Sequence, residues 1–342
     1  MRRLVIGHSD LDGVSLFLLF DYFEIPTSDR LALDYEDLEK DNIIWYALTF
    51  DEIFFIDITP SGLFLDSLLD SDVTFFVFDH HEERVQPLLE LPESPQYKIY
   101  YDADECGTSL FYKSILGDFD HPETKRIPQT NSVLEYFIQL VKIYDLWMID
   151  HELWEEALSL NRVYYASRNY NEQNTYSMAL PFLKAQYKKF TILNEWKWLK
   201  SEEEIITRSQ KIEQESYEKA TAVMEKRLDT KGRTFLIAPM RSKISLICAY
   251  ILYENPDTDY MIVINTYGGG INGKLSGRSS RGFDCTSIAA LNGHKPAAGG
   301  RVLVSDAYEL WQNQFACLKY NDEYSEGESY LTYTKEATQT AV

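Results

Sequence analysis

The chain has 342 residues, of which 33 are Lys or Arg and 54 are Asp or Glu, giving a formal net charge of −21. At about 150 residues per domain, this length predicts two domains. The acid excess argues against tight binding of long duplex nucleic acid, which proteins hold by its phosphates through a basic face. A short, metal-neutralised oligonucleotide stays compatible with it, and a well-solvated surface explains the excess equally well.

The cysteines and the start of the chain indicate a reducing compartment. The four cysteines are widely scattered without CxxC spacing, which favours buried thiols over disulfides or a zinc site. The chain begins MRRLVIG without a signal peptide, and no apolar run approaches the roughly 18 residues of a membrane span. We therefore expect a cytoplasmic protein with no membrane partner. Its oligomeric state stays open, with a homodimer as one option.

The first part of the chain alternates apolar, β-rich runs with helix-like stretches. Strands are predicted at residues 4–7, 52–58, 73–79 and 97–102, and helices near 13–23, 61–70 and 107–116. Residues 43–48 fit either a helix or a strand. This alternation predicts an α/β fold built on a doubly wound, mostly parallel sheet.

The second part of the chain changes pattern twice. Helical periodicity extends over about 131–230, with a long charged helix expected at 195–230, and strands return at 233–239 and 260–267. We therefore predict a first α/β domain at 1–190, a linker helix at 191–232, a second, smaller α/β domain at 233–320 and a poorly ordered polar tail at 321–342.

Three polar clusters near the N-terminus each follow an apolar run. They are His8-Ser9-Asp10-Leu11-Asp12-Gly13 after LVIG, Asp57 after EIFFI, and Asp79-His80-His81 after VTFFVF. Parallel strands bring their carboxyl ends to one edge of the sheet, where open α/β sheets bind their ligands. So many carboxylates share one crevice only if cations lie between them. The sequence therefore predicts a metal-centred site.

Each cluster on its own also has a structural explanation. Asp10 and Asp12 fit helix caps equally well, and Asp57 fits a helix or turn cap. The run Asp79-His80-His81 is stronger evidence, because neutral imidazoles are good ligands for a transition metal. Gly13 is expected to permit a tight turn into the following helix.

Taken together, these motifs resemble the DHH phosphoesterase family. The three clusters match its first three motifs, and Asp145 in KIYDLW matches the fourth, an aspartate in a helical region. In the second domain, GKLSGRSS (273–280) matches the serine-arginine-serine strand of the DHH-associated domain, and NGHKPAAGG (292–300) matches its glycine-rich loop. One glycine precedes His294 where the family often has three. The resemblance covers about residues 4–310 and is most similar to the nanoRNase and oligoribonuclease branch.

The resemblance implies a two-metal centre. Its ligands would be His8 and Asp10 for one ion, Asp12, His80 and Asp145 for the second, and Asp57 as the bridge between them. His81 would contact the substrate phosphate or the ligand shell, and Asp79 would orient the histidines from behind. Mixed imidazole and carboxylate ligation suits two Mn²⁺ ions, with Mg²⁺ as the alternative.

The resemblance also implies a substrate-binding set. In the second domain these residues are Ser276, Arg278, Ser279, Ser280, His294 and Gly299. Arg278 would fork two hydrogen bonds to a phosphate, and the Gly299-Gly300 turn would offer backbone N–H groups to an anion, although a Gly-rich run alone also fits a hairpin turn. In the first domain, Thr108 would bind phosphate at a helix N-terminus or simply serve as a helix cap.

The function that the resemblance implies is hydrolysis of short oligonucleotides, such as nanoRNA and the dinucleotides pApA and pGpG, to mononucleotides. A hydroxide held between two cations would attack the phosphodiester in line. The alternatives are a RecJ-like exonuclease for single-stranded DNA, a phosphatase for 3′-phosphoadenosine 5′-phosphate, and a nucleotide-binding regulatory module without turnover.

Overall fold

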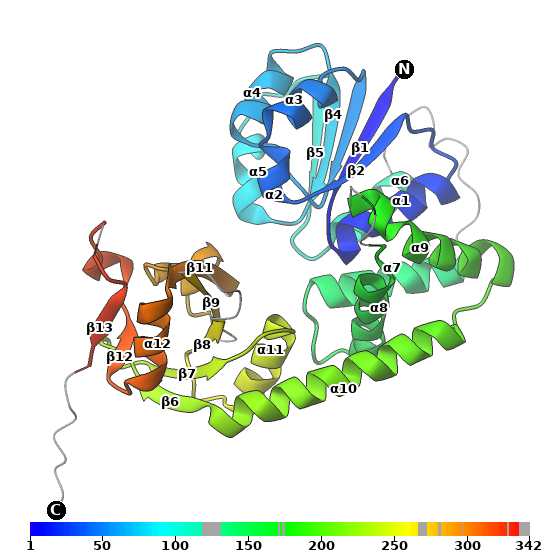
Figure 1. Ribbon diagram of the computed structural model, residues 1–342. Coiled ribbons are helices and arrows are strands. Elements are labelled where there is room, and N and C mark those ends of the chain that lie inside the picture. The colour runs from blue at the N-terminus through cyan, green and yellow to red at the C-terminus, as the bar shows by residue number, and fades with distance from the viewer. Residues whose placement is uncertain are drawn as a thin grey trace, which may run out of the picture. The chain divides into compact units, whose positions relative to one another are not determined.

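The computed structural model describes residues 1–117, 131–169, 172, 175–265, 272–279, 282–295, 297–326 and 328–334. The chain divides into two compact units, Met1–Thr207 and Arg208–Val342 (Figure 1). Each unit has its own sheet.

Unit 1 is built on a five-stranded parallel sheet with the strand order β2-β1-β3-β4-β5. The strands are β1 (Arg3–His8), β2 (Asp29–Leu33), β3 (Glu52–Ile56), β4 (Thr74–Asp79) and β5 (Tyr97–Tyr101). The chain first adds β2 on one side of β1 and then β3 on the other, so the switch point, where such sheets bind ligands, lies between β1 and β3. The predicted doubly wound sheet is confirmed, and the edge strand β2 is an addition to it.

Helices cover both faces of this sheet (Figure 1). They are α1 (Leu11–Tyr22), α2 (Tyr35–Leu38), α3 (Asp41–Ala47), α4 (Gly62–Leu69), α5 (Glu82–Leu89) and α6 (Gly107–Leu116). One face buries Ile6, Phe55 and Val77 against α3, α4 and α5. On the other face Phe54 packs edge-on against Phe20 of α1 and Phe111 of α6. Residues 43–48 therefore belong mainly to a helix, α3.

The rest of unit 1 is helical. It contains α7 (Ser132–Asp145), α8 (Trp154–Ser167), α9 (Thr175–Lys188), a π-helical turn at Lys189–Leu193 and the start of α10 (Lys200–Val223). The boundary between the two units falls within α10. The helix expected over 195–230 is shorter than predicted, because Glu225–Leu228 instead pairs as a strand with β7.

Unit 2 has a six-stranded mixed sheet with the order β10-β11-β9-β8-β7-β6. Its strands are β6 (Glu225–Leu228), β7 (Thr234–Pro239), β8 (Tyr260–Asn265), β9 (Asn272–Arg278), β10 (Asn292–His294) and β11 (Ala297–Leu303). The helices α11 (Ile244–Glu254) and α12 (Val304–Gln312) pack on opposite faces of this sheet. A second α/β unit after the long helix agrees with the predicted fold class.

The segment predicted as a polar tail is partly folded. The short strand β13 (Leu331–Tyr333) pairs with β12 (Ala316–Leu318), and Leu331 is only 8% exposed. The prediction of disorder over 321–342 is therefore wrong for this part, because a single buried leucine and a paired backbone offset the polar composition around them. Residues 335–342 lie outside the described residues.

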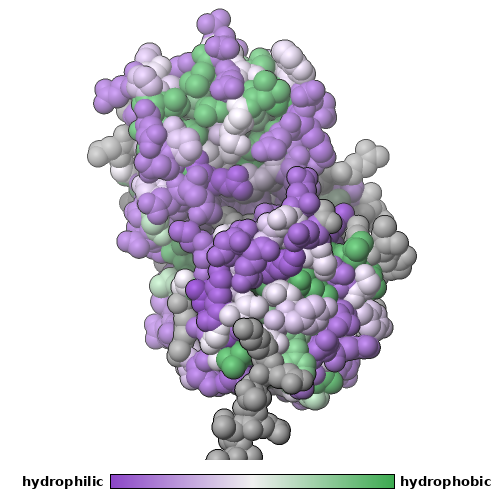
Figure 2. Space-filling view, turned by 90° about the vertical axis from the view of Figure 1, so that its left-hand side faces the viewer, coloured by the Kyte–Doolittle hydropathy of each residue, from purple (hydrophilic) through white to green (hydrophobic). Residues whose placement is uncertain are grey.

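The surface combines charged residues with exposed hydrophobic ones. Figure 2 shows one face that is largely hydrophilic, with hydrophobic residues gathered on its unit 1 part. Trp45 on α3 and Leu63 on α4 are 70% and 63% exposed. Among the described residues, no helix combines the length and the hydrophobicity needed to cross a bilayer.

Candidate metal centre

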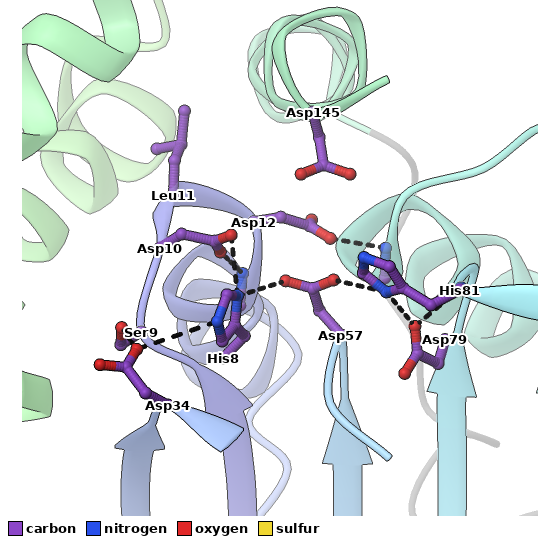
Figure 3. A network of polar contacts seen from close by, with 12 residues as sticks. His8, Ser9, Asp10, Leu11, Asp12, Asp34, Asp57, Asp79, His81 and Asp145 are labelled. Atoms are coloured by element: carbon purple, nitrogen blue, oxygen red, sulfur yellow. Dashed lines mark hydrogen bonds and ion pairs between the residues drawn. The ribbon is translucent and has the colours of Figure 1, made fainter. Parts of the chain in front are cut away.

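The three polar clusters meet at the carboxyl edge of the unit 1 sheet (Figure 3). His8 ends β1, and Asp57 follows β3. Asp79 ends β4 and is followed in the chain by His80 and His81. Asp57 lies between the other two clusters, with its oxygens 3.5 Å from His8 Nδ1 and 3.8 Å from His81 Nδ1. Convergence at the switch point follows directly from the strand order β1-β3-β4.

Two glycines let the backbone approach this edge closely. A Cβ at Gly13 would lie 2.3 Å from the backbone nitrogen of His8, and a Cβ at Gly107 would lie 2.7 Å from Cβ of Asp57. Gly13 therefore permits close packing of α1 on β1 rather than the tight turn that we expected. Asp57 itself has a left-handed backbone with φ of +59°, a conformation that aspartate tolerates better than most residues.

One group of donor atoms lies on the β1 side of the centre. His8 Nδ1 bonds Asp10 Oδ2 at 2.8 Å, and ligand atoms of His8, Asp10 and Asp57 all lie within 4.8 Å of one another. Asp10 also accepts a hydrogen bond from the backbone of Gly13 at 3.0 Å and so caps α1. Asp10 therefore caps α1 and also lies among the donor atoms where a metal ligand was expected.

A second group lies on the β4 side. Ligand atoms of Asp57, Asp79, His80 and His81 lie within 4.8 Å of one another. Asp79 is fully buried and already engaged, because its Oδ1 bonds His81 Nδ1 at 2.7 Å and its Oδ2 accepts from Thr59 Oγ1 at 2.6 Å. We therefore interpret Asp79 as the support of His81 rather than as a ligand. Only the two groups containing Asp57 form such clusters among the described residues, and Asp57 belongs to both.

The His80 ring has a different support from the one expected. Its Nδ1 bonds the backbone carbonyl of Glu105 at 2.9 Å, and its Nε2 lies 3.7 Å from Asp57 Oδ1. Asp79 contacts only the backbone N–H of His80, at 2.7 Å. Asp145, at the end of α7, places Oδ2 3.4 Å from His80 Nδ1, so the fourth motif does reach the centre.

Asp12 is buried beneath the centre and caps a helix. Its two carboxylate oxygens accept hydrogen bonds from the backbone N–H groups of Gly107 at 2.6 Å and Thr108 at 2.9 Å, at the start of α6. Thr108 Oγ1 also donates to the Asp12 carbonyl at 2.7 Å, and Thr108 is fully buried. The start of α6 thus binds the Asp12 carboxylate, and of the two roles considered for Thr108 these contacts favour a structural one at the helix N-terminus over phosphate binding.

The electrostatics of the centre favour cations. Burial and then the charges of Asp10 and Asp12 raise the pKa of Asp57 well above its usual range. Burial and the charges of Asp12 and Asp10 do the same to the pKa of Asp145. Burial would lower the pKa of His8, but Asp10 and Asp57 raise it to about 12. The close carboxylates of the centre therefore disfavour one another's ionisation, and a cation between them would compensate their charge.

The donor set fits divalent metal ions. Both oxygens of Asp57 and Oδ2 of Asp145 are buried and accept no hydrogen bond among the described residues. Buried carboxylate oxygens without a hydrogen bond are costly unless a cation contacts them. Imidazole nitrogens beside carboxylates suit Mn²⁺ or a similar transition metal, whereas Mg²⁺ prefers oxygen ligands.

In unit 2, the serine-arginine strand is β9. Arg278 donates through its Nη atoms to the carbonyls of Gly277 at 2.7 Å and Ala298 at 3.2 Å and to Ser245 Oγ at 3.0 Å, while its buried Nε has no partner among the described residues. Ser279 Oγ donates to the carbonyl of Asp259 at 3.1 Å. The Nη atoms of Arg278 and the hydroxyl of Ser279 are therefore engaged in internal hydrogen bonds. We had expected the Arg278 guanidinium to be open for two hydrogen bonds to a phosphate.

The glycine-rich loop is a strand in the structure. Gly299 lies within β11, paired with Ser276 of β9 on one side and Asn292 of β10 on the other. Because Gly299 is in extended backbone within a ladder, it forms no anion-binding turn, and that expectation is wrong. The backbone of His294 pairs with Ala297 in the same ladder, although its side chain is not described. Ser280 lies outside the described residues.

Three polar residues near the centre escaped the sequence interpretation. Thr59 holds Asp79, Glu105 holds His80, and Asp34 accepts from Ser9 and lies 3.8 Å from His8 Nε2. Asp34 follows β2 directly, so the same strand-end rule would have found it had β2 been recognised. Thr59 and Glu105 carry no such local pattern.

Comparison with known proteins supports the fold. No family model and no curated protein sequence matches the chain. The structure of a DHH domain from a member of a ribosomal-protein family has a TM-score of 0.55 at 13% identity, covering 90% of this chain and 84% of that one. A pGpG-specific phosphodiesterase from Vibrio cholerae has a TM-score of 0.53 at 14% identity, covering 91% and 96%. At these identities the likeness concerns the fold. The chain has the fold of the DHH-domain proteins, the family that its motifs resemble.

Proposed function

We propose that this protein is a metal-dependent phosphoesterase that hydrolyses short oligonucleotides, including dinucleotides such as pGpG and pApA, to mononucleotides. The observation that carries the proposal is Asp57. It is a buried carboxylate without hydrogen bonds among the described residues, and two clusters of imidazole and carboxylate donors share it. A carboxylate in that position would hold both ions of a two-metal phosphoesterase, which stabilise the attacking and leaving oxygens when bound.

The residues around Asp57 form two groups, one for each proposed ion. His8, Asp10 and Asp57 would hold one Mn²⁺ ion, and Asp57 with His80, assisted by Asp12 and Asp145, would hold the other. Two such ions, when bound, lower the pKa of a water molecule and stabilise the attacking and leaving oxygens of a phosphodiester. Mg²⁺ would be the weaker activator.

His81 is the residue that we assign to the substrate. Its Nδ1 bonds the Asp79 carboxylate at 2.7 Å, and a carboxylate only accepts hydrogen bonds, so Nδ1 carries the proton. The Nε2 atom of a neutral His81 then carries no proton and can contact the phosphate or the leaving group. Asp79 keeps this tautomer in place, since Thr59 holds its other oxygen.

Unit 2 carries a cationic face that supports an anionic substrate. Lys274, Ser276 and Arg278 alternate along β9, and Arg301 on β11 is in register with Lys274. Alternate residues of a strand and their register partners share one face, so three cations lie on it. Lys274 and Arg301 are exposed. In a chain with a net charge of −21, this concentration supports an anionic substrate small enough to be held by few phosphate contacts.

The state of the thiols supports a cytoplasmic location. All four cysteines are free and buried, which suits a reducing compartment. We therefore propose the cytoplasm as the location of the enzyme.

The test measures hydrolysis with Mn²⁺ or Mg²⁺. Substrates are a ladder of 5′-labelled RNAs from the dinucleotide upwards, the matching single-stranded DNA ladder, pGpG, pApA and 3′-phosphoadenosine 5′-phosphate. We expect the shortest RNAs to be cleaved fastest, and Asp57→Asn and His80→Ala to lose at least about a hundredfold in kcat/KM. Preferential degradation of long DNA would instead indicate a RecJ-like exonuclease, and full activity in both variants would refute the two-metal mechanism.

A further inference from the structure

The His80 ring is oriented by a backbone carbonyl that belongs to Glu105. The distance from His80 Nδ1 to that carbonyl oxygen is 2.9 Å. A carbonyl oxygen only accepts hydrogen bonds, so Nδ1 carries the ring proton of neutral His80. The unprotonated Nε2 then faces Asp57, 3.7 Å away. The position of one carbonyl thus decides which nitrogen of His80 a metal would meet.

The side chain of the same residue fixes that carbonyl. The Glu105 carboxylate is 4% exposed and accepts from Lys142 Nζ at 2.7 Å, from Ser109 Oγ at 2.7 Å and from Lys113 Nζ. Burial opposes ionisation, but these partners lower the pKa of Glu105. A buried carboxylate with three donors is held in one geometry, since moving it would leave a charge uncompensated.

Lys142 connects this carboxylate to another candidate ligand. It lies on α7 three residues before Asp145, so the two side chains lie on the same side of the helix. Asp145 Oδ2 is 3.4 Å from His80 Nδ1. Glu105 therefore contacts His80 through its carbonyl and, through Lys142, the helix that carries Asp145.

We propose that Glu105 is a positioning residue of the metal centre. Its carboxylate, held by Lys142 and Lys113, determines the His80 tautomer and the position of the Asp145 carboxylate. The proposal rests on the proposed function, because it concerns the second ion of that centre. Glu105 is not a ligand in this scheme, since its carboxylate is occupied by the two lysines and Ser109. Its effect is transmitted through the backbone and through α7.

The two lysines provide a matched pair of variants. Lys142 is 27% exposed and joins Glu105 to α7, whereas Lys113 is 63% exposed and extends from α6, the helix that Glu105 already adjoins. Lys142→Met should therefore disturb Asp145, while Lys113→Met should remove a partly solvated contact of small effect. Both changes delete one positive charge, so a general charge effect would make them equal.

The experiment measures metal binding in the full chain, apart from turnover. Mn²⁺ titration followed by electron paramagnetic resonance gives the affinity of each ion, and ¹⁵N shifts of the histidine rings in the metal-free protein give the His80 tautomer. For Glu105→Ala and Lys142→Met we expect the second ion, the one assigned to His80 and Asp145, to bind about 10- to 100-fold less tightly. We also expect the Nδ1–H form of His80 to lose population in Glu105→Ala. Glu105→Gln should recover part of both effects, and Lys113→Met should change the affinity less than about fivefold.

Several results would overturn the proposal. If folded Glu105→Ala keeps its Mn²⁺ affinities and its His80 shifts and only melts earlier, Glu105 has a purely structural role. If Lys113→Met and Lys142→Met weaken binding equally, the connection through α7 is wrong. If Glu105→Ala does not fold, Lys142→Met and Glu105→Gln decide by the same measurements. Normal metal responses in a protein that cleaves no phosphodiester would instead contradict only the proposed function.

Discussion

At the scale of single residues, Asp57 combines three unusual features of the candidate metal centre. Its backbone is left-handed, its carboxylate is 1% exposed, and neither oxygen accepts a hydrogen bond among the described residues. Each of these features costs stability on its own. Proteins keep such features where function needs them, and the proposed role of Asp57 as a metal ligand would account for all three.

The substitution Asp57→Asn should stabilise the metal-free protein at neutral pH. Because neighbouring carboxylates and burial raise the pKa of Asp57, an ionised side chain there is unfavourable, whereas a neutral amide avoids the repulsion and tolerates the left-handed backbone. We expect a higher melting temperature with EDTA and loss of the increase that Mn²⁺ causes in the wild type. Asp79→Asn is the matched control.

That control should change stability in the opposite direction. Burial would raise the pKa of Asp79, but His81 and Thr59 lower it, so its ionised form stabilises the fold. Asp79→Asn should therefore lower the free energy of unfolding by about 1.5–3 kcal/mol. Equal melting shifts in Asp57→Asn and Asp79→Asn, measured by calorimetry, would contradict the electrostatic account of the centre.

The stability of the metal-free protein should also depend on pH through Asp57. A group whose folded pKa is raised stabilises fully below its unfolded pKa, about 3.9, and loses this contribution as pH rises through the folded value. The melting temperature of the wild type should therefore fall relative to that of Asp57→Asn as pH rises from about 4 towards neutrality. A flat difference would show that Asp57 is ionised without metal.

At the scale of elements, the turn from Glu105 into α6 supports the centre from below. Its carbonyl at Glu105 holds His80, its first helical N–H groups hold Asp12, and Gly107 leaves room for Asp57. A helix N-terminus carries a partial positive charge, so it stabilises the ionised form of the carboxylate that it binds. One short segment thus contacts residues that follow β1, β3 and β4.

Replacing Gly107 by alanine should distort this support. The added Cβ would lie 2.7 Å from Cβ of Asp57 and 2.8 Å from its backbone nitrogen, and neither atom can move without shifting the strand end. We expect the free energy of unfolding to fall by about 1–3 kcal/mol, together with weaker Mn²⁺ binding, measured by denaturant titration and calorimetry. Gly117→Ala, at the other end of α6, is the control and should leave metal binding unchanged. Intact metal binding in Gly107→Ala would contradict this role of the turn.

At the scale of the whole molecule, the two units divide the proposed work. All candidate metal ligands lie in unit 1, and the cationic face of β9 and β11 lies in unit 2. Substrate recognition and metal binding should therefore respond to different substitutions.

Arg278→Met should separate these two properties. We expect KM for a dinucleotide to rise about 10- to 100-fold, the value of one hydrogen bond from Arg278 Nε, which has no partner among the described residues, to a charged group, while Mn²⁺ affinity stays that of the wild type. Lys226→Met is the control, since Lys226 lies on the far edge strand β6 and pairs with Asp257. The assignment of Arg278 fails if both variants give the same KM, or if Arg278→Met loses metal instead.

The sequence by itself determined four of the five strands of the unit 1 sheet and the approximate place of the candidate metal centre. Apolar runs that end in Asp57 or in Asp79-His80-His81 are local patterns, and parallel strands bring such ends together whatever the loops do. Only the tertiary structure decided which groups support the ligands. Asp12 meets Gly107 across 95 residues of chain, and His80 meets Glu105 across 25. These partners are backbone groups, which every residue carries and no side-chain pattern marks. Packing also placed Gly299 in a strand, because pairing with neighbouring strands outweighed the local preference of glycine for a turn. Leu331 lies in a paired strand, because burial of its side chain outweighed the polar composition of the segment.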